Sequence, residues 1–372
     1  MRPLIDGHLD LALNALGIRR AITQPLEAIR AAEADLPRGP NRPFDTATVS
    51  LPDLRAAGAI LVVTTLIARA RPWRSRSGQA VGSLDFPDQD GAHAMAAAQL
   101  DYTRCLEDRN ILRIITTTRD LPALDTPTPL TDDQPLPILL TFEGTDPVRD
   151  LDDLHRWHAQ GVRTLMLAHF GRSTHAHGTP SEPYNHHPND VDGPLTAEGR
   201  RLLPEIEALG MPLDLTHLSD TSLYEAIDRF GGAIYASHCG ARALVPECQR
   251  NLPDEVIKTI AQRGGVIGLP LHGPYLVSDF APETPREHCS IEHAADHLDH
   301  IAQLTGSDRH VALGTDMDGG FGLEYTPTGI DRYAELPKLG ALLETRGWSD
   351  EAINRLFAGN WHRFFASHLP AS

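Results

Sequence analysis

Runs of apolar residues recur along the chain at intervals that suit buried strands. The clearest run is Ala59–Thr65, which is aliphatic or β-branched throughout. Continuous runs of this kind, without alternation of apolar and polar positions, are typical of parallel strands covered on both faces. The predicted strands are Leu4–Asp6, Ala59–Thr65, Pro137–Phe142, Arg163–Ala168, Met211–Leu215, Ala233–Ala236, Gly265–Leu269 and His310–Leu313. A shorter run, Ile111–Thr116, predicts an accessory strand.

Stretches with helical character lie between these runs. Ser219 and Ser290 each stand where a serine caps the first turn of a helix, and Gly161 stands where a glycine ends one. The predicted helices are Leu26–Ala34, Ala92–Glu107, Leu151–Gln160, Thr196–Leu209, Ser219–Phe230, Pro253–Gln262, Ile291–Leu304, Tyr333–Arg346 and Asp350–Ser367.

This alternation of strands and helices predicts parallel strands joined by helical crossovers. Eight such units favour a closed (β/α)8 barrel of the TIM type, an α/β fold that commonly reaches this length as one domain. We find no linker that divides the chain, and we expect a single domain over residues 1–372. An open doubly wound sheet is the alternative, but no glycine-rich phosphate loop follows the first strand.

Polar residues with ligand chemistry follow the predicted strands. His8 and Asp10 come at the end of the first strand, and because alternate side chains of a strand share one side, both point the same way. The remaining strand-end residues are Glu143, His169, His217, His238 and Asp316. Each alone fits a structural histidine, a helix-terminal acid or a turn. In a barrel, however, all these ends converge on the face where active sites are found.

The number of candidate ligands indicates the kind of site. Leaving His169 aside, three histidines and three carboxylates exceed what one tetrahedral ion binds. They suit two ions that share a bridging carboxylate, as in many hydrolases. Mixed imidazole and carboxylate donors favour zinc, with manganese or cobalt as alternatives. We expect Glu143 to bridge, because its strand lies between the two sets.

The loop Arg172–Asp192 is rich in histidine, with His175, His177, His186 and His187. Histidine-rich tracts can bind metal, but the position of this loop after the fourth strand favours a solvated loop at the barrel rim. The cysteines, Cys105, Cys239, Cys248 and Cys289, have no CxxC spacing, and we expect free thiols.

A formal net charge of -17 argues against nucleic acid or an anionic membrane as partner. Some of the excess acid could surround bound cations, although a solvated acidic surface explains most of it. We find no signal peptide, membrane span or lipid-anchor motif, and we therefore expect a cytoplasmic protein. A homodimer is one open possibility.

With these residues assembled, the chain resembles the membrane dipeptidase (renal dipeptidase) family of zinc peptidases, within the amidohydrolase-like barrels. The resemblance runs nearly from end to end. The motifs that carry it are Asp6-Gly7-His8-Leu9-Asp10, Phe142-Glu143-Gly144, Asp214-Leu215-Thr216-His217-Leu218-Ser219, Ser237-His238, Arg250-Asn251-Leu252-Pro253-Asp254 and Gly314-Thr315-Asp316-Met317-Asp318-Gly319.

The resemblance implies a binuclear zinc hydrolase that cleaves the amide bond of small dipeptides. Tolerance of a D-residue at the C-terminal position of the dipeptide is left open. It implies that His8, Asp10 and Glu143 hold one zinc and that Glu143, His217 and His238 hold the other. It further implies that His169 and Arg250 contact the substrate and that Asp316 handles the proton of the attacking water. From the residues alone, Arg250 fits a surface ion pair equally well.

Two rival functions and two departures from the family remain. A lactonase, deacetylase or phosphoesterase could use the same site, whereas a binding protein without turnover is disfavoured because no ligand is missing. The aromatic segment that mammalian members carry after the seventh strand is replaced here by Gly268–Leu271, followed by His272. The loop Arg172–Asp192 is also longer than we expect. Both departures lie on the substrate side.

Overall fold

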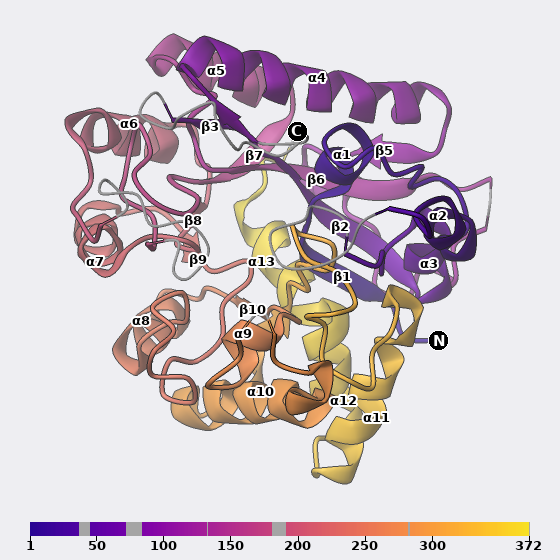
Figure 1. Cartoon of the computed structure of the whole chain (residues 1–372). Coiled ribbons are helices and arrows are strands. Elements are labelled where there is room, and N and C mark those ends of the chain that lie inside the picture. The colour runs from indigo at the N-terminus through magenta and orange to yellow at the C-terminus, as the bar shows by residue number, and fades with distance from the viewer. Residues whose placement is uncertain (37–44, 72–83, 132, 181–190, 282, 372) are drawn as a thin grey trace.

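The computed structural model describes residues 1–36, 45–71, 84–131, 133–180, 191–281 and 283–371. Its centre is a barrel of parallel strands in the order β10-β11-β1-β2-β6-β7-β8-β9 (Figure 1). The barrel closes between β9 and β10, where Gly268 N donates to Ala236 O at 2.8 Å. The barrel strands are β1 Leu4–Leu9, β2 Ala59–Leu66, β6 Leu136–Glu143, β7 Val162–Met166, β8 Leu213–Asp214, β9 Ile234–Tyr235, β10 Ile267–Leu269 and β11 Val311–Leu313.

Helices surround this barrel and complete the predicted (β/α)8 architecture, which is confirmed (Figure 1). The helices are α1 Leu11–Leu16, α2 Leu26–Ala32, α3 Leu51–Ala56, α4 Gln89–Asp108, α5 Leu151–Ala159, α6 Ala197–Ala208, α7 Asp220–Arg229, α8 Asp254–Gln262, α9 Gly273–Leu276, α10 Ile291–Thr305, α11 Pro337–Thr345, α12 Asp350–Asn354 and α13 Asn360–His368. The predicted accessory strand is β5, Leu112–Ile114, which pairs with the start of β6. A separate two-stranded sheet joins β3, Arg69–Ala70, to β4, Asp85–Phe86.

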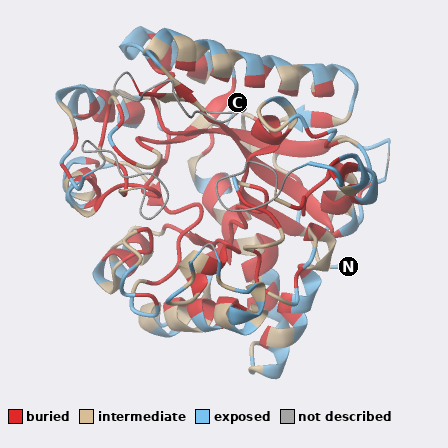
Figure 2. Cartoon of the chain, viewed as in Figure 1, coloured by how far each residue is buried: buried red, intermediate tan, exposed pale blue. Residues whose placement is uncertain are grey.

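The two faces of the strands pack into two apolar clusters, and both are buried (Figure 2). The larger cluster lies between the barrel and the surrounding helices, with Trp157 of α5 and Ile206 of α6 among its members. The smaller one joins strand residues such as Ile5 and Leu139 to Trp361, Phe364 and Phe365 of α13, and we call it the floor cluster. No side chain fits at Gly7 of β1, since a Cβ there would lie 2.4 Å from the Trp361 ring.

The two halves of the barrel differ in the length of their strands. In the first half, β1, β2, β6 and β7 have between 5 and 8 residues. In the second half, β8, β9, β10 and β11 have only 2 or 3. The sequence predicted longer strands there, over Met211–Leu215 and Ala233–Ala236. They stop early because the amides of Thr216 and Ser237 donate to the carboxylate of Asp214, both at 3.0 Å.

Helix boundaries also depart from prediction, for identifiable reasons. The segment Asp350–Ser367 contains a π turn at Arg355–Gly359, beside which the Asn360 amide donates to the carbonyls of Asp308 and Val311. The segment Tyr333–Arg346 breaks into a 3-10 turn and α11, because Pro337 opens the helix. Ser219 precedes α7 without capping it, since its hydroxyl donates instead to Gly193 O. The short helices α1, α3 and α9 were not predicted.

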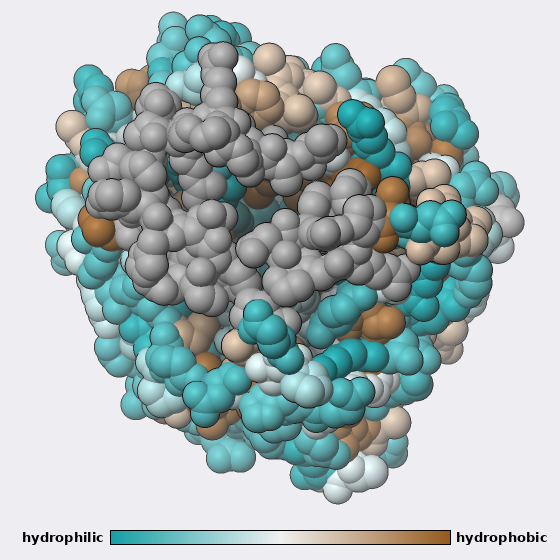
Figure 3. All heavy atoms as spheres, in the orientation of Figure 1, coloured by the Kyte–Doolittle hydropathy of each residue, from teal (hydrophilic) through white to brown (hydrophobic). Residues whose placement is uncertain are grey.

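Hydrophilic residues predominate on the face shown in Figure 3, outside the atoms drawn in grey. None of the helices in the described residues has both the length and the apolar character needed to cross a membrane.

Candidate metal centre

The structure brings the strand-end residues of the sequence analysis together at one end of the barrel. His8 lies in β1 with Asp10 directly after it, and Glu143 is the last residue of β6. His217, His238 and Asp316 lie just beyond the short strands β8, β9 and β11. All six are buried, with exposed fractions of 7% or less.

Glu143 lies at the centre of this group. Its Oε1 is 3.1 Å from His217 Nε2, 3.5 Å from His8 Nε2 and 3.7 Å from His238 Nε2. His169 Nε2 lies 3.6 Å from the same oxygen. One carboxylate oxygen therefore faces imidazole nitrogens from both halves of the barrel, which is the position that a bridging ligand requires.

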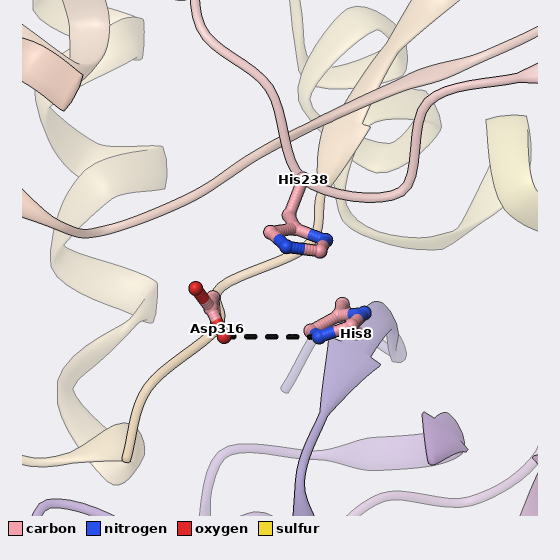
Figure 4. Close-up of side chains that lie close together, drawn as sticks. All are labelled: His8, His238 and Asp316. Atoms are coloured by element: carbon pink, nitrogen blue, oxygen red, sulfur yellow. Dashed lines mark ion pairs between the residues drawn. The ribbon is translucent and has the colours of Figure 1, made fainter. Parts of the chain in front are cut away.

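Three overlapping sets of side chains have ligand atoms close enough to hold one ion each. These sets are His8 with Asp10 and Glu143, Glu143 with His217 and His238, and His8 with His238 and Asp316. Figure 4 shows the third set, in which Asp316 Oδ1 lies 3.7 Å from His8 Nε2. Within the part of the chain that the structure describes, every such cluster is drawn from these six residues.

The unpaired atoms of the site indicate a cation. His8 Nε2 and Glu143 Oε2 are buried and have no hydrogen-bond partner among the described residues. The Nε2 atoms of His217 and His238 face each other at 3.1 Å. Buried polar atoms are rarely left unsatisfied, and imidazole with carboxylate is the donor set that zinc accepts. The residues present therefore fit divalent cations.

Burial sets the protonation of these ligands. It lowers the pKa of His8, His217 and His238, so the imidazoles are neutral as metal binding requires. Burial, followed by the charge of Glu143, raises the pKa of Asp10 to about 8, and burial raises that of Glu143 to about 7. Carboxylates crowded in this way are stabilised in their charged form by a bound cation.

Two further aspartates hold the ligands in place. Asp6 Oδ1 accepts the amides of His8 at 3.0 Å and Thr315 at 2.9 Å, while its Oδ2 accepts the hydroxyls of Thr315 and Tyr333. Asp214 Oδ1 accepts the amides of Thr216 and Ser237. Each aspartate thus fixes the segments that carry two ligands on neighbouring strands. Both stand in motifs quoted above, two or three residues before a site histidine, but no role was predicted for either.

Two site residues of the second half occupy strained backbone. His217 has φ +68° and Asp316 has φ +54°, in the left-handed region that non-glycine residues seldom adopt. Such conformations persist only where the surroundings impose them, and they concentrate at functional sites. Nothing in the sequence pattern indicates them.

Arg250 is buried beside the site, at 4% exposure, and the surface ion pair considered above is therefore wrong. Its Nη2 donates to His238 O at 2.9 Å and its Nη1 to Cys239 Sγ at 3.1 Å, while the guanidinium lies 5.3 Å from the Tyr275 ring centre. Among the described residues, no carboxylate forms a salt bridge with it. One hydrogen on each terminal nitrogen is left for a ligand.

The described part of the histidine-rich loop departs from the expectation of a solvated rim. His175 is only 4% exposed, its Nδ1 lies 2.9 Å from Thr145 Oγ1, and burial lowers its pKa to about 4. His177 Nδ1 lies 2.7 Å from Pro194 O. His186 and His187 lie outside the described residues.

Fold and site together define an α/β barrel with a candidate metal centre at the carboxyl ends of its strands. The family model "Membrane dipeptidase (Peptidase family M19)" matches residues 1–368, and this chain belongs to that family. The resemblance inferred from the motifs is confirmed.

Individual relatives agree with this assignment. "Dipeptidase tcpJ" of Claviceps purpurea is 30% identical over 207 residues, covering 56% of this chain and 45% of that one. "Dipeptidase 3" of Macaca fascicularis is 25% identical over 364 residues, covering 98% of this chain and 64% of that one. The chain thus spans less than two thirds of the length of either relative. A metallo peptidase of Rhodobacter sphaeroides, solved with a phosphinate mimic of the dipeptide L-Ala-D-Ala, has the same fold at 23% identity, with a TM-score of 0.75 over 99% of both chains.

Proposed function

We propose that this protein is a binuclear zinc dipeptidase. The observation that carries the proposal is the position of Glu143 Oε1, between His8 of one ligand set and His217 and His238 of the other. His8, Asp10 and Glu143 would hold one zinc, and Glu143, His217 and His238 the second. The bound ions would supply Lewis-acid polarisation of the scissile carbonyl and a nucleophilic water near neutral pH.

Asp316 is the residue that accepts the proton of the attacking water in this proposal. Its carboxylate is close to His8 and belongs to the same cluster as His238. Burial, followed by the charges of Glu143 and Asp10, raises the pKa of Asp316 well above its usual value. A carboxylate made more basic in this way can hold a proton and return it to the leaving amine.

Arg250 provides the reason to favour dipeptides. A buried guanidinium without a carboxylate partner is costly unless an anion reaches it. The free α-carboxylate of a short peptide is such an anion, and arginine can bind it with two parallel hydrogen bonds. A clamp on the terminal carboxylate beside the metal centre restricts cleavage to the adjacent bond.

The substrate side of the site is aromatic. His272 stacks on Phe321 with ring centres 4.1 Å apart, and it meets Tyr275 edge-on at 4.5 Å. Burial lowers the pKa of His272 to about 3, so this wall is uncharged. We propose that small dipeptides bind against it and that a C-terminal D-residue is tolerated, a proposal supported by the L-Ala-D-Ala mimic bound to the Rhodobacter sphaeroides protein.

The alternative function is another metal-dependent amidohydrolase, such as a lactonase or deacetylase, on the same centre. The two functions differ in their need for a carboxylate clamp. The deciding experiment compares steady-state kinetics on L-Ala-L-Ala, on L-Ala-D-Ala and on their C-terminal amides with the zinc-loaded protein. We expect the amides to be cleaved poorly. Equal cleavage of acid and amide would favour the alternative.

Variants of Arg250 sharpen this test. Arg250→Gln is expected to raise KM for the free acid by a factor that corresponds to roughly 2–4 kcal/mol, with the rate on the amide unchanged. Arg250→Lys keeps the charge but not the planar fork, and should recover only part of the loss. A KM for the free acid that is the same in all three proteins would contradict the clamp.

We also propose a cytoplasmic location and an association of two copies. The excess negative charge supports the absence of nucleic-acid and anionic-membrane partners. Cell fractionation tests the location, and light scattering on the purified protein tests the dimer. A monomer at micromolar concentration would end the second proposal.

A further inference from the structure

Arg69 is a charged residue of the site to which the sequence analysis gave no role. It lies in β3, where it pairs with Asp85 of β4, and the Arg69 Nε donates to Asp85 Oδ1 at 2.7 Å. Its Nη1 lies 3.1 Å from His169 Nδ1. Asp85, Arg69 and His169 therefore form a chain of contacts that leads from the small sheet into the metal centre.

The chemistry of the guanidinium decides the protonation of His169. An arginine side chain has five N–H donors and no acceptor, and it stays protonated in proteins. In the contact between Arg69 and His169, the arginine must donate and the imidazole Nδ1 must accept. Neutral imidazole carries one proton, and that proton is therefore on Nε2.

Nε2 is the atom of His169 that faces the site. It lies 3.6 Å from Glu143 Oε1, a distance at which no hydrogen bond forms, so its N–H is left for another acceptor. The ring is held by neighbours, because it packs against His217 at 4.2 Å and meets Phe170 edge-on at 4.8 Å.

The backbone of His169 is held as closely as its ring. At Gly178, a Cβ would lie 1.5 Å from the His169 carbonyl oxygen, so no side chain fits there. Gly144, at φ +90°, lies against the His169 amide on another side, since a Cβ would be 3.2 Å from that nitrogen. A donor that is fixed in this way needs no reorganisation when charge develops on a substrate oxygen.

We propose that Arg69 is a positioning residue, which fixes His169 as a neutral imidazole with its proton on Nε2 and aims that N–H at the substrate's carbonyl oxygen. The inference rests on the proposed amide hydrolysis for its purpose, but the tautomer itself does not depend on any activity. No proton leaves His169 in this role, because it donates a hydrogen bond only. The general base must then be another group, which agrees with the role of Asp316.

The test measures the tautomer directly. In the zinc-loaded protein labelled with 15N-histidine, the His169 resonances are assigned by their loss in His169→Gln. We expect a protonated Nε2 and a bare Nδ1 in the wild type and in Arg69→Lys, which keeps a donor. Arg69→Met keeps the length of the side chain and removes the donor, and should give a mixture of tautomers. A proton on Nδ1 in the wild type, or an unchanged tautomer in Arg69→Met, would overturn the proposal.

Arg71 supplies the matched control. It stands two residues away, its charge also lowers the pKa of His169, and it bonds to Asp146 and to Phe170 O without touching the imidazole. Arg71→Gln should leave the His169 tautomer as in the wild type. If Arg69→Met does not fold, the wild-type spectrum still decides, because a proton on Nδ1 there is incompatible with donation from Arg69.

Kinetics then separate this proposal from the function it serves. Arg69→Met should lower kcat on L-Ala-D-Ala by about 10–100-fold, with KM and zinc content nearly unchanged and with rescue in Arg69→Lys. A wild-type protein with the expected tautomer but no cleavage of any dipeptide would contradict the proposed function alone. A normal kcat in Arg69→Met together with a changed tautomer would contradict the role of the donor.

Discussion

The two halves of the barrel hold their ligands by different means. In the half made of β1, β2, β6 and β7, His8 and Glu143 belong to long strands. Glu143 pairs with Met166 in the strand ladder, whereas the amide of His8 donates to Asp6 Oδ1 at an irregular point of β1. In the half made of β8 to β11, the strands end early and the ligands lie beyond them. In that half, backbone amides beyond the strand ends donate to side-chain carboxylates. The Thr315 amide donates to Asp6, and the amides of Thr216 and Ser237 donate to Asp214.

This difference assigns different tasks to the two halves. In a regular strand, backbone hydrogen bonds orient a side chain without specific contacts from other side chains. A site residue at positive φ, such as His217 or Asp316, depends on specific partners that hold the strained backbone. Glu143 of the first half is thus positioned by regular strand pairing, whereas the geometry of the site residues in the second half depends on side-chain hydrogen bonds.

The largest expected effect comes from removing the one ligand that faces both halves. Glu143→Gln keeps the shape of the side chain but removes its charge, so both ions lose a ligand. We expect kcat/KM on a dipeptide to fall by roughly 10³-fold or more, because stabilisation worth several kcal/mol is lost. Zinc content after dialysis, measured by elemental analysis, should fall well below that of the wild type.

Glu33→Gln is the control, since Glu33 is also buried and paired with Arg20 but belongs to none of the candidate metal clusters of the described residues. It should retain its zinc. If Glu143→Gln weakened zinc binding at one site and left the other site unchanged, the two sets of ligands would be independent. The bridging role of Glu143 would then be wrong.

A smaller effect compares the two supporting aspartates. Asp6 accepts four hydrogen bonds through both oxygens, whereas Asp214 Oδ2 has no partner among the described residues. Asp6→Asn should therefore lower the free energy of unfolding of the metal-free protein by about 2–4 kcal/mol, and Asp214→Asn by about 1 kcal/mol or less. Urea unfolding at neutral pH measures both. Equal losses of unfolding free energy would show that the number of hydrogen bonds accepted by each aspartate does not determine its contribution to stability.

A further effect on stability is a pH dependence of the second half. His297 of α10 accepts the Ala241 amide at Nδ1, 2.9 Å away, and its Nε2 lies 3.2 Å from Leu276 O, so its neutral form supports the segment after β9. Burial lowers the pKa of His297 to about 4, below the unfolded value of about 6.5. This stabilisation is complete above pH ~6.5 and is lost as the pH falls towards 4.

The predicted size follows from linkage. Between pH 7 and pH 5, the metal-free wild type should lose about 2 kcal/mol of unfolding free energy through this histidine. His297→Gln should lack that part of the pH dependence, and the exposed His155→Gln should keep it. Urea unfolding at the two pH values decides, and an unchanged pH dependence in His297→Gln would place the acid-sensitive group elsewhere.

The first half of the barrel was the more predictable from sequence. Its strands are long apolar runs, and a polar residue such as Glu143 stands out at the end of one. The second half gave correct ligand candidates but wrong strand lengths, because the hydrogen bonds of Asp214 replace a ladder that the apolar pattern alone suggests.

Other features could not be read from the sequence at all. Positive φ at His217 and Asp316 results from tertiary contacts, since neither residue type requires it. The contact between Arg69 and His169 joins residues 100 positions apart, and no local pattern marks Arg69. The polar loop around His175 predicts a solvated side chain, yet the structure buries this histidine against Thr145.

The floor cluster has a consequence for how the protein is synthesised. Its aromatic side chains, Trp361, Phe364 and Phe365, come from α13, whereas Ile5 and Leu139 come from strands made much earlier. A ribosome that has completed β11 at Leu313 must still add 48 residues to reach Trp361. At about 5–20 residues per second, this takes roughly 2–10 s. During that interval the aromatic side chains of α13 are not yet available to cover the strand residues of the floor cluster. The nascent chain then exposes an apolar surface that chaperones can bind.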